Sequence, residues 1–372
     1  MSDSREPANS SSFDLKSLVR PVVAELPSYV PGIGAAKKVD RLVRLDMNES
    51  PYGPSPKAQA AIAAFVTTHR YPDFDQWALR DAIATYTGTT AEQVFCGAGC
   101  DDVLNLVAQA VLEPDDEIIV SEPTFGVYRM QANLRGAKTV NVPLTDDFQL
   151  DADGILGAVT DKTKYIIICT PNNPTGNELD SADILRIVKE APCLVLIDEA
   201  YSEFAGTSYV DLVDRHPNVL IFRTMSKFAG LAGMRVGYGI FPKAMAPHFE
   251  NIVQPCHNVS FVSSVAAIAS LNDLDYLNGV VAHIVASRDE LAANLREISG
   301  VEPYPSATNF LLVKLPVEDG GPVVAELANR GILVRHFANS ALGIGDCLRV
   351  TIGTTEENER FLEELADILG DS

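Results

Sequence analysis

A lysine set among hydroxyl residues is the most reactive group that the sequence offers. It lies in Arg223-Thr224-Met225-Ser226-Lys227-Phe228-Ala229-Gly230-Leu231-Ala232-Gly233-Met234-Arg235, which begins where the apolar run 219–223 ends. A lysine in a desolvated, cation-rich pocket has a lowered pKa and can form a Schiff base. Thr224, Ser226 and Arg235 are of the types that bind a phosphate group. A lone lysine is usually a solvated surface residue, but this setting favours a reactive amine.

An aspartate follows a second apolar run, in Leu194-Val195-Leu196-Ile197-Asp198-Glu199-Ala200-Tyr201. Asp198 would stand at the carboxyl end of a strand, where open α/β sheets bind ligands. An aspartate there is often the N-cap of a helix. Beside a pyridine ring it would instead keep the ring nitrogen protonated, and a protonated ring withdraws electrons from a substrate. Tyr201 could reach a neighbouring ring hydroxyl.

A glycine-rich turn, Cys96-Gly97-Ala98-Gly99-Cys100-Asp101-Asp102, lies between a predicted strand and a predicted helix. Glycines let the backbone approach a ligand, and the free N–H groups of a first helical turn suit a phosphate. The turn lacks the third glycine of a dinucleotide-binding fingerprint, which argues against that reading. A tight turn without a ligand is the plain alternative.

The heptad Thr170-Pro171-Asn172-Asn173-Pro174-Thr175-Gly176 directly follows the apolar run 165–169. Two prolines and a glycine fix the turn. An asparagine amide in this position can point into the crevice at the strand ends. The sequence therefore places four polar groups at one edge of a predicted sheet.

Apolar runs alternate with helical patterns from residue 55 to residue 262 and must position these groups. Such alternation is typical of βαβ units, in which helices cover both faces of a mainly parallel sheet. Predicted helices span 55–66, 76–86 and 100–112. Predicted strands end near residue 96 or span 117–120, 139–142, 165–169, 194–197 and 219–223.

The pattern changes after residue 262 and predicts a smaller α+β domain. Its expected helices are 262–271, 279–298 and 356–369, and its expected strands are 309–313, 333–335 and 348–351. We expect a disordered tail at 1–12, an N-terminal arm at 13–45 that packs on the small domain, a large domain at 46–262 and a small domain at 263–372.

Composition excludes several classes of partner. A net charge of −21 should repel nucleic acid and anionic membrane, and no run is apolar enough to span a bilayer. Six cysteines without a CxxC pair and six histidines without an HxxxH cluster predict reduced thiols and no metal site. We expect a cytoplasmic location.

Taken together, these segments resemble those of the histidinol-phosphate aminotransferase family, a group of fold-type I pyridoxal-phosphate enzymes. The resemblance runs from Leu26-Pro27-Ser28-Tyr29-Val30-Pro31-Gly32 to Leu348-Arg349-Val350-Thr351-Ile352-Gly353. Further matching segments are Leu45-Asp46-Met47-Asn48-Glu49-Ser50-Pro51-Tyr52-Gly53-Pro54 and Tyr71-Pro72-Asp73. The resemblance implies an α/β fold, pyridoxal 5'-phosphate as cofactor, and an amino donor and 2-oxoglutarate as substrates.

The resemblance also implies roles for the cofactor residues. Lys227 would carry the cofactor and move the proton between the substrate Cα and the cofactor C4′. Asp198 would pair with the pyridine nitrogen, Asn173 and Tyr201 would hold the ring oxygen, and Phe125 would stack on the ring. The implied phosphate ligands are Gly99, Cys100, Asp101, Thr224, Ser226, Arg235 and, across a homodimer interface, Tyr71.

Four residues are expected to bind the substrate: Tyr29, Asn48, Arg335 and Arg349. By resemblance Arg349 grips the anionic end. We expect Arg335 to be a second substrate arginine, because a single arginine supplies too little positive charge to bind a dianion in so acidic a protein. Alternatively, Arg335 forms an ion pair at the surface. Ser50, Cys100 and Phe125 stand where the family often has Asn, Ser and Tyr, which loosens the assignment of substrate.

The outline of the chain favours histidinol phosphate as amino donor, and close relatives leave alternatives. One is an aromatic amino acid, phenylalanine or tyrosine. Another changes the reaction to decarboxylation of threonine phosphate. A non-enzymatic alternative is a ligand sensor in a transcription regulator, which would carry an N-terminal DNA-binding domain. Only about forty residues precede Asn48-Glu49 here and the charge is strongly acidic, so we set this alternative aside.

Overall fold

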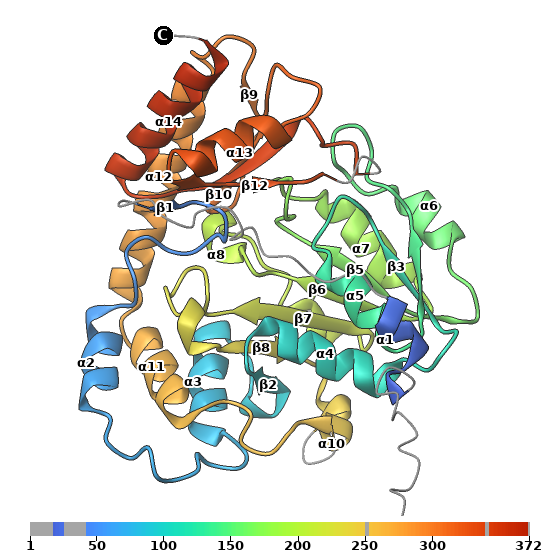
Figure 1. Ribbon diagram of the computed structural model, residues 1–372. Coiled ribbons are helices and arrows are strands. Elements are labelled where there is room, and N and C mark those ends of the chain that lie inside the picture. The colour runs from blue at the N-terminus through green and yellow to red at the C-terminus, as the bar shows by residue number, and fades with distance from the viewer. Residues whose placement is uncertain (1–17, 26–41, 250–252, 339–341, 371–372) are drawn as a thin grey trace, which may run out of the picture. The chain divides into compact units, whose positions relative to one another are not determined.

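The computed structural model describes residues 18–25, 42–249, 253–338 and 342–370 (Figure 1). The chain divides into two compact units, 1–30 and 31–372. In the first unit the described residues form helix α1 (Pro21–Glu25). The predicted tail, most of the predicted arm and Tyr29 lie outside the described residues.

A seven-stranded sheet with the order β2-β8-β7-β6-β5-β3-β4 forms the centre of the second unit (Figure 1). Its strands are β2 (Val94–Gly97), β3 (Glu117–Val120), β4 (Lys138–Asn141), β5 (Thr163–Cys169), β6 (Leu194–Asp198), β7 (Val219–Thr224) and β8 (Gly237–Ile240). β8 is antiparallel to both its neighbours, and the pairs from β7 to β4 are parallel. The predicted α/β fold with a mainly parallel sheet is confirmed.

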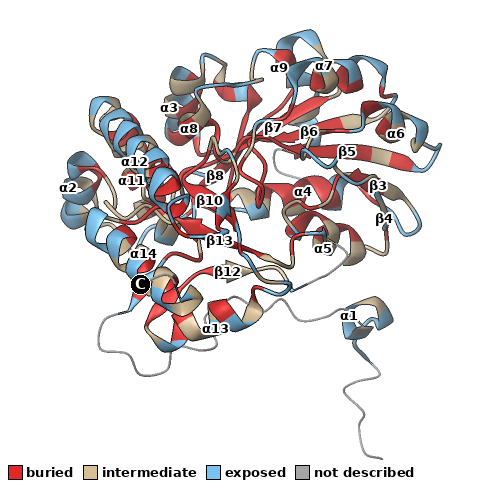
Figure 2. Ribbon diagram, turned by 90° about the horizontal axis from the view of Figure 1, so that it is seen from above, coloured by how far each residue is buried: buried red, intermediate tan, exposed pale blue. Residues whose placement is uncertain are grey.

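Helices cover both faces of this sheet, and Figure 2 shows α4 (Cys100–Val111) and α5 (Val127–Asn133) on one side and α7 (Ser181–Glu190) and α9 (Leu212–Arg215) on the other. Leu196, Leu220 and Phe222 pack in one cluster with residues of α4 and α5. Ile197 and Ile221 pack in the other, with residues of α3 (Trp77–Thr87), α7 and α9. The strands are apolar at consecutive positions because both faces are buried.

The helices of this region are α2 (Pro56–Ala64), α3 (Trp77–Thr87), α4 (Cys100–Val111), α5 (Val127–Asn133), α6 (Ala152–Gly157), α7 (Ser181–Glu190), α8 (Ser202–Ala205), α9 (Leu212–Arg215), α10 (Ala246–His248) and α11 (Phe261–Leu271). Short 3-10 turns span Ala91–Gln93, Ala232–Met234 and Lys243–Met245.

A second, antiparallel sheet has the order β12-β13-β10-β9. It comprises β9 (Glu302–Pro303), β10 (Phe310–Lys314), β12 (Arg335–His336) and β13 (Cys347–Thr351), with helices α12 (Leu274–Leu295), α13 (Gly321–Asn329) and α14 (Thr355–Leu369). The end of the predicted arm, β1 (Val43–Arg44), pairs in parallel with β11 (Ile332–Leu333). The domain boundaries given above stay a prediction.

Two expectations about elements are wrong, and one strand was missed. The predicted strand 333–335 is two strands in different sheets, β11 and β12, separated by Val334. The helix expected from 279 begins at Leu274, because burial of its apolar face offsets the cost of Gly279 inside it, about 1 kcal/mol. β8 was not predicted, since Gly237 and Gly239 give it a low strand propensity.

Candidate active site at the strand ends

Asp198 is the last residue of β6, and its side chain is buried. Tyr128 donates a hydrogen bond from its hydroxyl to Oδ2 (2.6 Å), and the backbone N–H of Ala200 donates one to Oδ1 (3.0 Å). Burial raises the pKa of Asp198 to about 6, although both hydrogen bonds lower it. A bound cation would restore its charge, so the group is suited to a protonated ring nitrogen.

Lys227 lies in the turn after β7 and is half-buried. Its Nζ donates a hydrogen bond to the backbone oxygen of Met47 (2.9 Å). Burial, together with the charge of Arg349, lowers the pKa of Lys227 to about 8. The expected depression of the lysine pKa is therefore present, and it makes the neutral amine accessible near neutral pH.

The glycine-rich turn forms a cradle against β8. A Cβ on Gly237 would lie 2.0 Å from the backbone nitrogen of Cys100, so a side chain there would push α4 away. Gly99 has a φ of 97°, and a Cβ on it would lie 2.3 Å from the Arg235 guanidinium. Thr224 is the partner of Gly237 in the β7–β8 ladder. The start of α4, Arg235 and Thr224 thus lie around one space.

Further contacts belong to this cradle. The Arg235 guanidinium lies 4.0 Å from the Asp101 carboxylate, and both side chains are half exposed. The backbone N–H of Ser226 donates to Thr224 Oγ1 (3.1 Å). Burial raises the pKa of the Cys100 thiol well above its ordinary value, so the thiol stays protonated. Backbone N–H groups at the start of α4 and an exposed guanidinium are suited to a phosphate.

Arg349 is buried and bridges the two sheets. Its Nη1 donates to Asn173 Oδ1 (2.5 Å), and its Nη2 donates to the backbone oxygen of Asp46 (2.7 Å). The guanidinium also lies 5.2 Å from the ring centre of Phe310. A cation in this position is suited to an anionic group that enters from the space between the sheets.

Asn48 and Tyr201 meet beside Arg349. Asn48 Nδ2 donates to the Tyr201 hydroxyl (2.9 Å), and the backbone N–H of Asn48 donates to Thr351 Oγ1 (2.9 Å). Burial raises the pKa of Tyr201, which keeps its hydroxyl protonated and able to donate. Asn309, which binds the backbone oxygen of Asn48 (3.1 Å), completes the support.

The other predicted site residues have different surroundings. Phe125 is half-buried, with its ring edge-on to Tyr128 (5.6 Å between centres). Arg335 is half-buried and lies directly opposite Arg349 in the β12–β13 ladder. Tyr71 is 82% exposed and stacks on His257 (4.9 Å between centres); in the described part of the chain its ring contacts none of the other predicted site residues.

Sequence reasoning missed Tyr128, which binds the Asp198 carboxylate. It lies on α5, three residues after Phe125, which precedes the helix, and its contact with Asp198 depends on how α5 packs on the sheet. It also missed Asn309 and Thr351, which no local pattern connects to Asn48. Within the described ranges, no group of three or more metal-ligating side chains occurs, and no helix is long and apolar enough to cross a membrane.

The chain is similar over most of its length to known aminotransferases. A family model described as "Aminotransferase class I and II" matches residues 40–365. A histidinol-phosphate aminotransferase from Roseiflexus castenholzii is 42% identical over 369 residues, covering 94% of this chain and 98% of that protein. A chloroplastic one from Nicotiana tabacum is 37% identical over 355 residues, covering 93% and 85%. The crystal structure of histidinol-phosphate aminotransferase from Sinorhizobium meliloti, in complex with pyridoxal-5'-phosphate, has a TM-score of 0.84 at 29% identity and covers 97% of this chain and 98% of that one.

Proposed function

The chain belongs to the aminotransferase class I and II family, and on that premise we propose that it is a pyridoxal-phosphate-dependent histidinol-phosphate aminotransferase of histidine biosynthesis. The reaction would convert histidinol phosphate and 2-oxoglutarate to imidazole acetol phosphate and glutamate. The observation that carries the proposal is the buried Asp198 carboxylate at the end of β6, with a lysine of lowered pKa in the turn after the neighbouring strand β7. Relatives of the same printed activity, similar over nearly their whole length, support the choice of substrate.

Pyridoxal phosphate fits the residues at the strand ends. Asp198 would hold the ring nitrogen, and Asn173 with Tyr201 would hold the ring oxygen. Phe125 would face the ring. The phosphate would lie in the cradle formed by Gly99, Cys100, Asp101, Thr224, Ser226 and Arg235. When bound, the cofactor supplies an electron-withdrawing ring that stabilises negative charge at the substrate Cα.

The residues of the chain then divide the work of proton transfer. Lys227, as a neutral amine, would move the proton between the substrate Cα and the cofactor C4′. The charge of Asp198 would keep the ring nitrogen of the bound cofactor protonated. Tyr128 and Ala200, which both donate to Asp198, fix the direction of the carboxylate. The hydrogen bond of Lys227 to Met47 must break before the amine reaches the substrate.

The two arginines of the small sheet support an anionic substrate. Arg335 and Arg349 are direct partners in the β12–β13 ladder, so their side chains leave the same face. Like charges in opposed positions destabilise a sheet unless an anion lies between them. We assign Arg349 to the carboxylate of 2-oxoglutarate or the phosphate of the donor, and Arg335 to the same phosphate as its second arginine. Tyr29 and Asn48 remain proposed substrate ligands.

A homodimer is part of the proposal. The connection from α2 to α3 and the first residue of α3 expose apolar side chains: Val66 is 80% exposed, Tyr71 82%, Phe74 49% and Trp77 46%. Such a patch is typical of a protein–protein interface. A second copy covering it would bring Tyr71 to the phosphate of the other subunit. The six cysteines all carry free thiols, which suits the cytoplasm.

Products distinguish the proposal from its alternatives. The protein, loaded with pyridoxal phosphate, is given 2-oxoglutarate with histidinol phosphate, phenylalanine or threonine phosphate in separate reactions. Glutamate formation with kcat/KM highest for histidinol phosphate is the expected result. A higher value for phenylalanine would favour an aromatic aminotransferase, and carbon dioxide from threonine phosphate without glutamate would favour a decarboxylase.

A further inference from the structure

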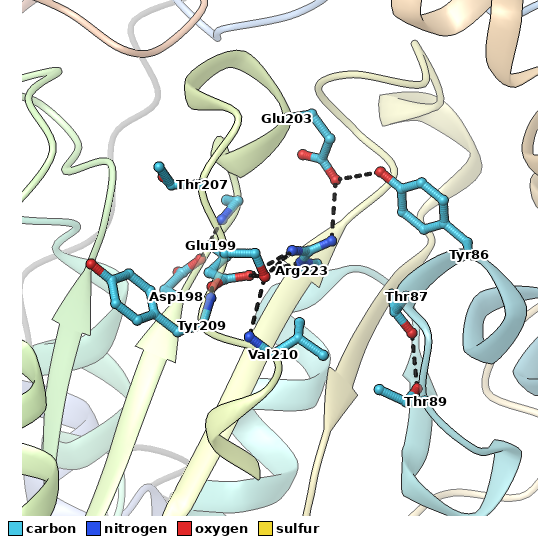
Figure 3. Close-up of polar contacts among 12 residues, drawn as sticks. Tyr86, Thr87, Thr89, Asp198, Glu199, Glu203, Thr207, Tyr209, Val210 and Arg223 are labelled. Carbon is cyan, nitrogen blue, oxygen red and sulfur yellow. Dashed lines mark hydrogen bonds and ion pairs between the residues drawn. The ribbon is translucent and has the colours of Figure 1, made fainter. Parts of the chain in front are cut away.

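A buried ion cluster lies behind the proposed active site, centred on Arg223 (Figure 3). Arg223 donates from Nε (2.9 Å) and approaches with Nη2 (2.8 Å) to the same oxygen of Glu199. Its Nη2 also donates to Ser208 Oγ (2.7 Å), and its Nη1 lies 3.9 Å from Glu203 Oε1. The Tyr86 hydroxyl donates to that Glu203 oxygen (3.3 Å). The arginine and Glu199 are almost wholly buried, with side chains 8% and 1% exposed.

This cluster closes the open end of the ladder between β6 and β7. The last paired residues are Asp198 and Phe222, and the backbone N–H of Glu199 still donates to the oxygen of Phe222 (2.8 Å). The Glu199–Arg223 ion pair lies one residue beyond. Because side chains alternate along a strand, Glu199 and Arg223 leave the face opposite to Asp198 and Thr224. The ion pair therefore fixes the strand ends without occupying the proposed cofactor space.

The same cluster reaches the turn that carries Lys227. The ring of Tyr86 stacks on Phe228, with 5.8 Å between centres and 8° between planes. Phe228 is the residue after Lys227 and is buried. Tyr86 thus contacts the ion cluster through its hydroxyl and the lysine turn through its face. The Arg223 guanidinium therefore connects the end of β6 with the turn after β7. The proposed reaction needs these two segments at a fixed distance and orientation.

Stability alone does not require such a cluster. Burying charges costs desolvation energy, and well-packed apolar side chains of similar volume often stabilise a fold as well or better. An ion cluster also fixes the orientation of its members, because a planar guanidinium donates its hydrogen bonds in a fixed geometry. Displacing catalytic groups by about 1 Å can cost about 10²-fold in rate.

We propose that Arg223 is a positioning residue, which holds Asp198 and Lys227 in catalytic relation through its contacts with Glu199, Glu203 and, beyond Glu203, Tyr86. The inference rests on the proposed function, since it concerns where the two proposed catalytic groups stand. It predicts a loss in the chemical step rather than in substrate binding.

The test compares Arg223→Met with Arg223→Lys in the full-length protein loaded with pyridoxal phosphate. Arg288→Met is the matched control, because Arg288 is also buried and binds a carboxylate and a backbone oxygen, but on α12. Three quantities are measured per cofactor-bearing subunit: kcat and KM with histidinol phosphate, and the pH dependence of the cofactor absorbance without substrate. Thermal unfolding of each cofactor-free protein reports the structural cost.

Arg223→Met is expected to lower kcat by about 10²-fold with KM within about threefold, and Arg223→Lys to recover about tenfold of the loss. The absorbance titration should move by about one pH unit, because the Glu199 charge would no longer be neutralised beside Asp198. Arg288→Met should lower the unfolding temperature but leave kcat within about twofold.

A wild-type kcat and an unmoved titration in Arg223→Met, with only a lower unfolding temperature, would overturn the inference. If Arg223→Met does not fold, Glu199→Gln, which keeps the shape and removes the charge, is judged by the same criteria. A wild-type protein that binds no pyridoxal phosphate would contradict the proposed function itself, and this inference with it; the wild-type spectrum therefore separates the two failures.

Discussion

The two sides of the proposed site are built in different ways. On the cofactor side, Asp198 and Lys227 stand at or just beyond the ends of neighbouring parallel strands, β6 and β7. On the substrate side, Arg335 and Arg349 face each other across the short antiparallel pair β12–β13. One side takes its geometry from the edge of a large buried sheet. The other takes it from the register of two strands.

Because of this difference, we expect substitutions on the two sides to change different kinetic constants. The strand ends of the large sheet are fixed by ladders on both sides and by the buried ion cluster around Arg223. Changes there should act on the chemical step while substrate still binds. Changes on the substrate side should act on KM and on the choice of donor, and leave the cofactor in place.

The largest effect is expected from Lys227→Ala, which removes the amine that we propose moves the proton. Transamination should fall by at least about 10⁴-fold. The protein should stay folded, as measured by circular dichroism, because Nζ makes one hydrogen bond. Lys164→Ala, on β5, is the control and should keep its activity. Retained turnover in Lys227→Ala would refute the assignment of the base.

Asp198→Asn should lower kcat by about 10³-fold, since it removes the charge and keeps the shape. Tyr128→Phe removes one hydrogen bond to the Asp198 carboxylate (2.6 Å) and should lower kcat by about tenfold. The two variants separate charge from orientation at the same carboxylate. Equal losses in both would mean that the charge of Asp198 contributes little.

Arg335→Gln should show the opposite signature on the substrate side. KM for histidinol phosphate is expected to rise by about 10- to 100-fold, because a charge-assisted contact to a phosphate is lost. KM for phenylalanine, which has no phosphate, should change much less. Steady-state kinetics with both donors measure this, and equal effects would remove Arg335 from the phosphate site.

The smallest effect concerns the stability of the cofactor-free protein. Burial lowers the pKa of Lys227 from 10.5 to about 8, so between these values the unfolded chain binds more protons than the native one. The Lys227 contribution to stability is therefore unfavourable below pH 8 and vanishes as the pH rises to 10.5. Urea unfolding should show Lys227→Ala gaining on the wild type at pH 8 and losing that advantage at pH 10.5. A gap that does not change with pH would contradict the lowered pKa.

The cofactor side could be predicted from sequence because each group stands directly after an apolar run. Asp198, Thr224 and Lys227 needed the position of one strand end each, and the observed strands end within one residue of prediction. Tyr128 was not predicted as a site residue because its contact with Asp198 depends on how α5 packs on the sheet. β8 was not predicted because its glycines, which let the start of α4 approach, also lower the strand propensity of the segment.

The substrate side could not be derived in the same way. Arg349 meets Asn173, 176 positions earlier in the chain, and no local pattern carries that pairing. The sequence predicted Arg335 as the last residue of the strand 333–335. In the structure it is the first residue of β12, which lies in a different sheet from β11. The cluster of Glu199 and Arg223, 24 positions apart, likewise depends on the parallel pairing of β6 with β7.

The central claim is tested most directly by a half-reaction without keto acid. The purified protein, loaded with pyridoxal phosphate, is mixed with histidinol phosphate and separately with phenylalanine, and the loss of the yellow cofactor absorbance is followed. The account predicts fast bleaching by histidinol phosphate and slow bleaching by phenylalanine. A protein that pyridoxal phosphate cannot turn yellow would contradict the role of Lys227 and the proposed function with it.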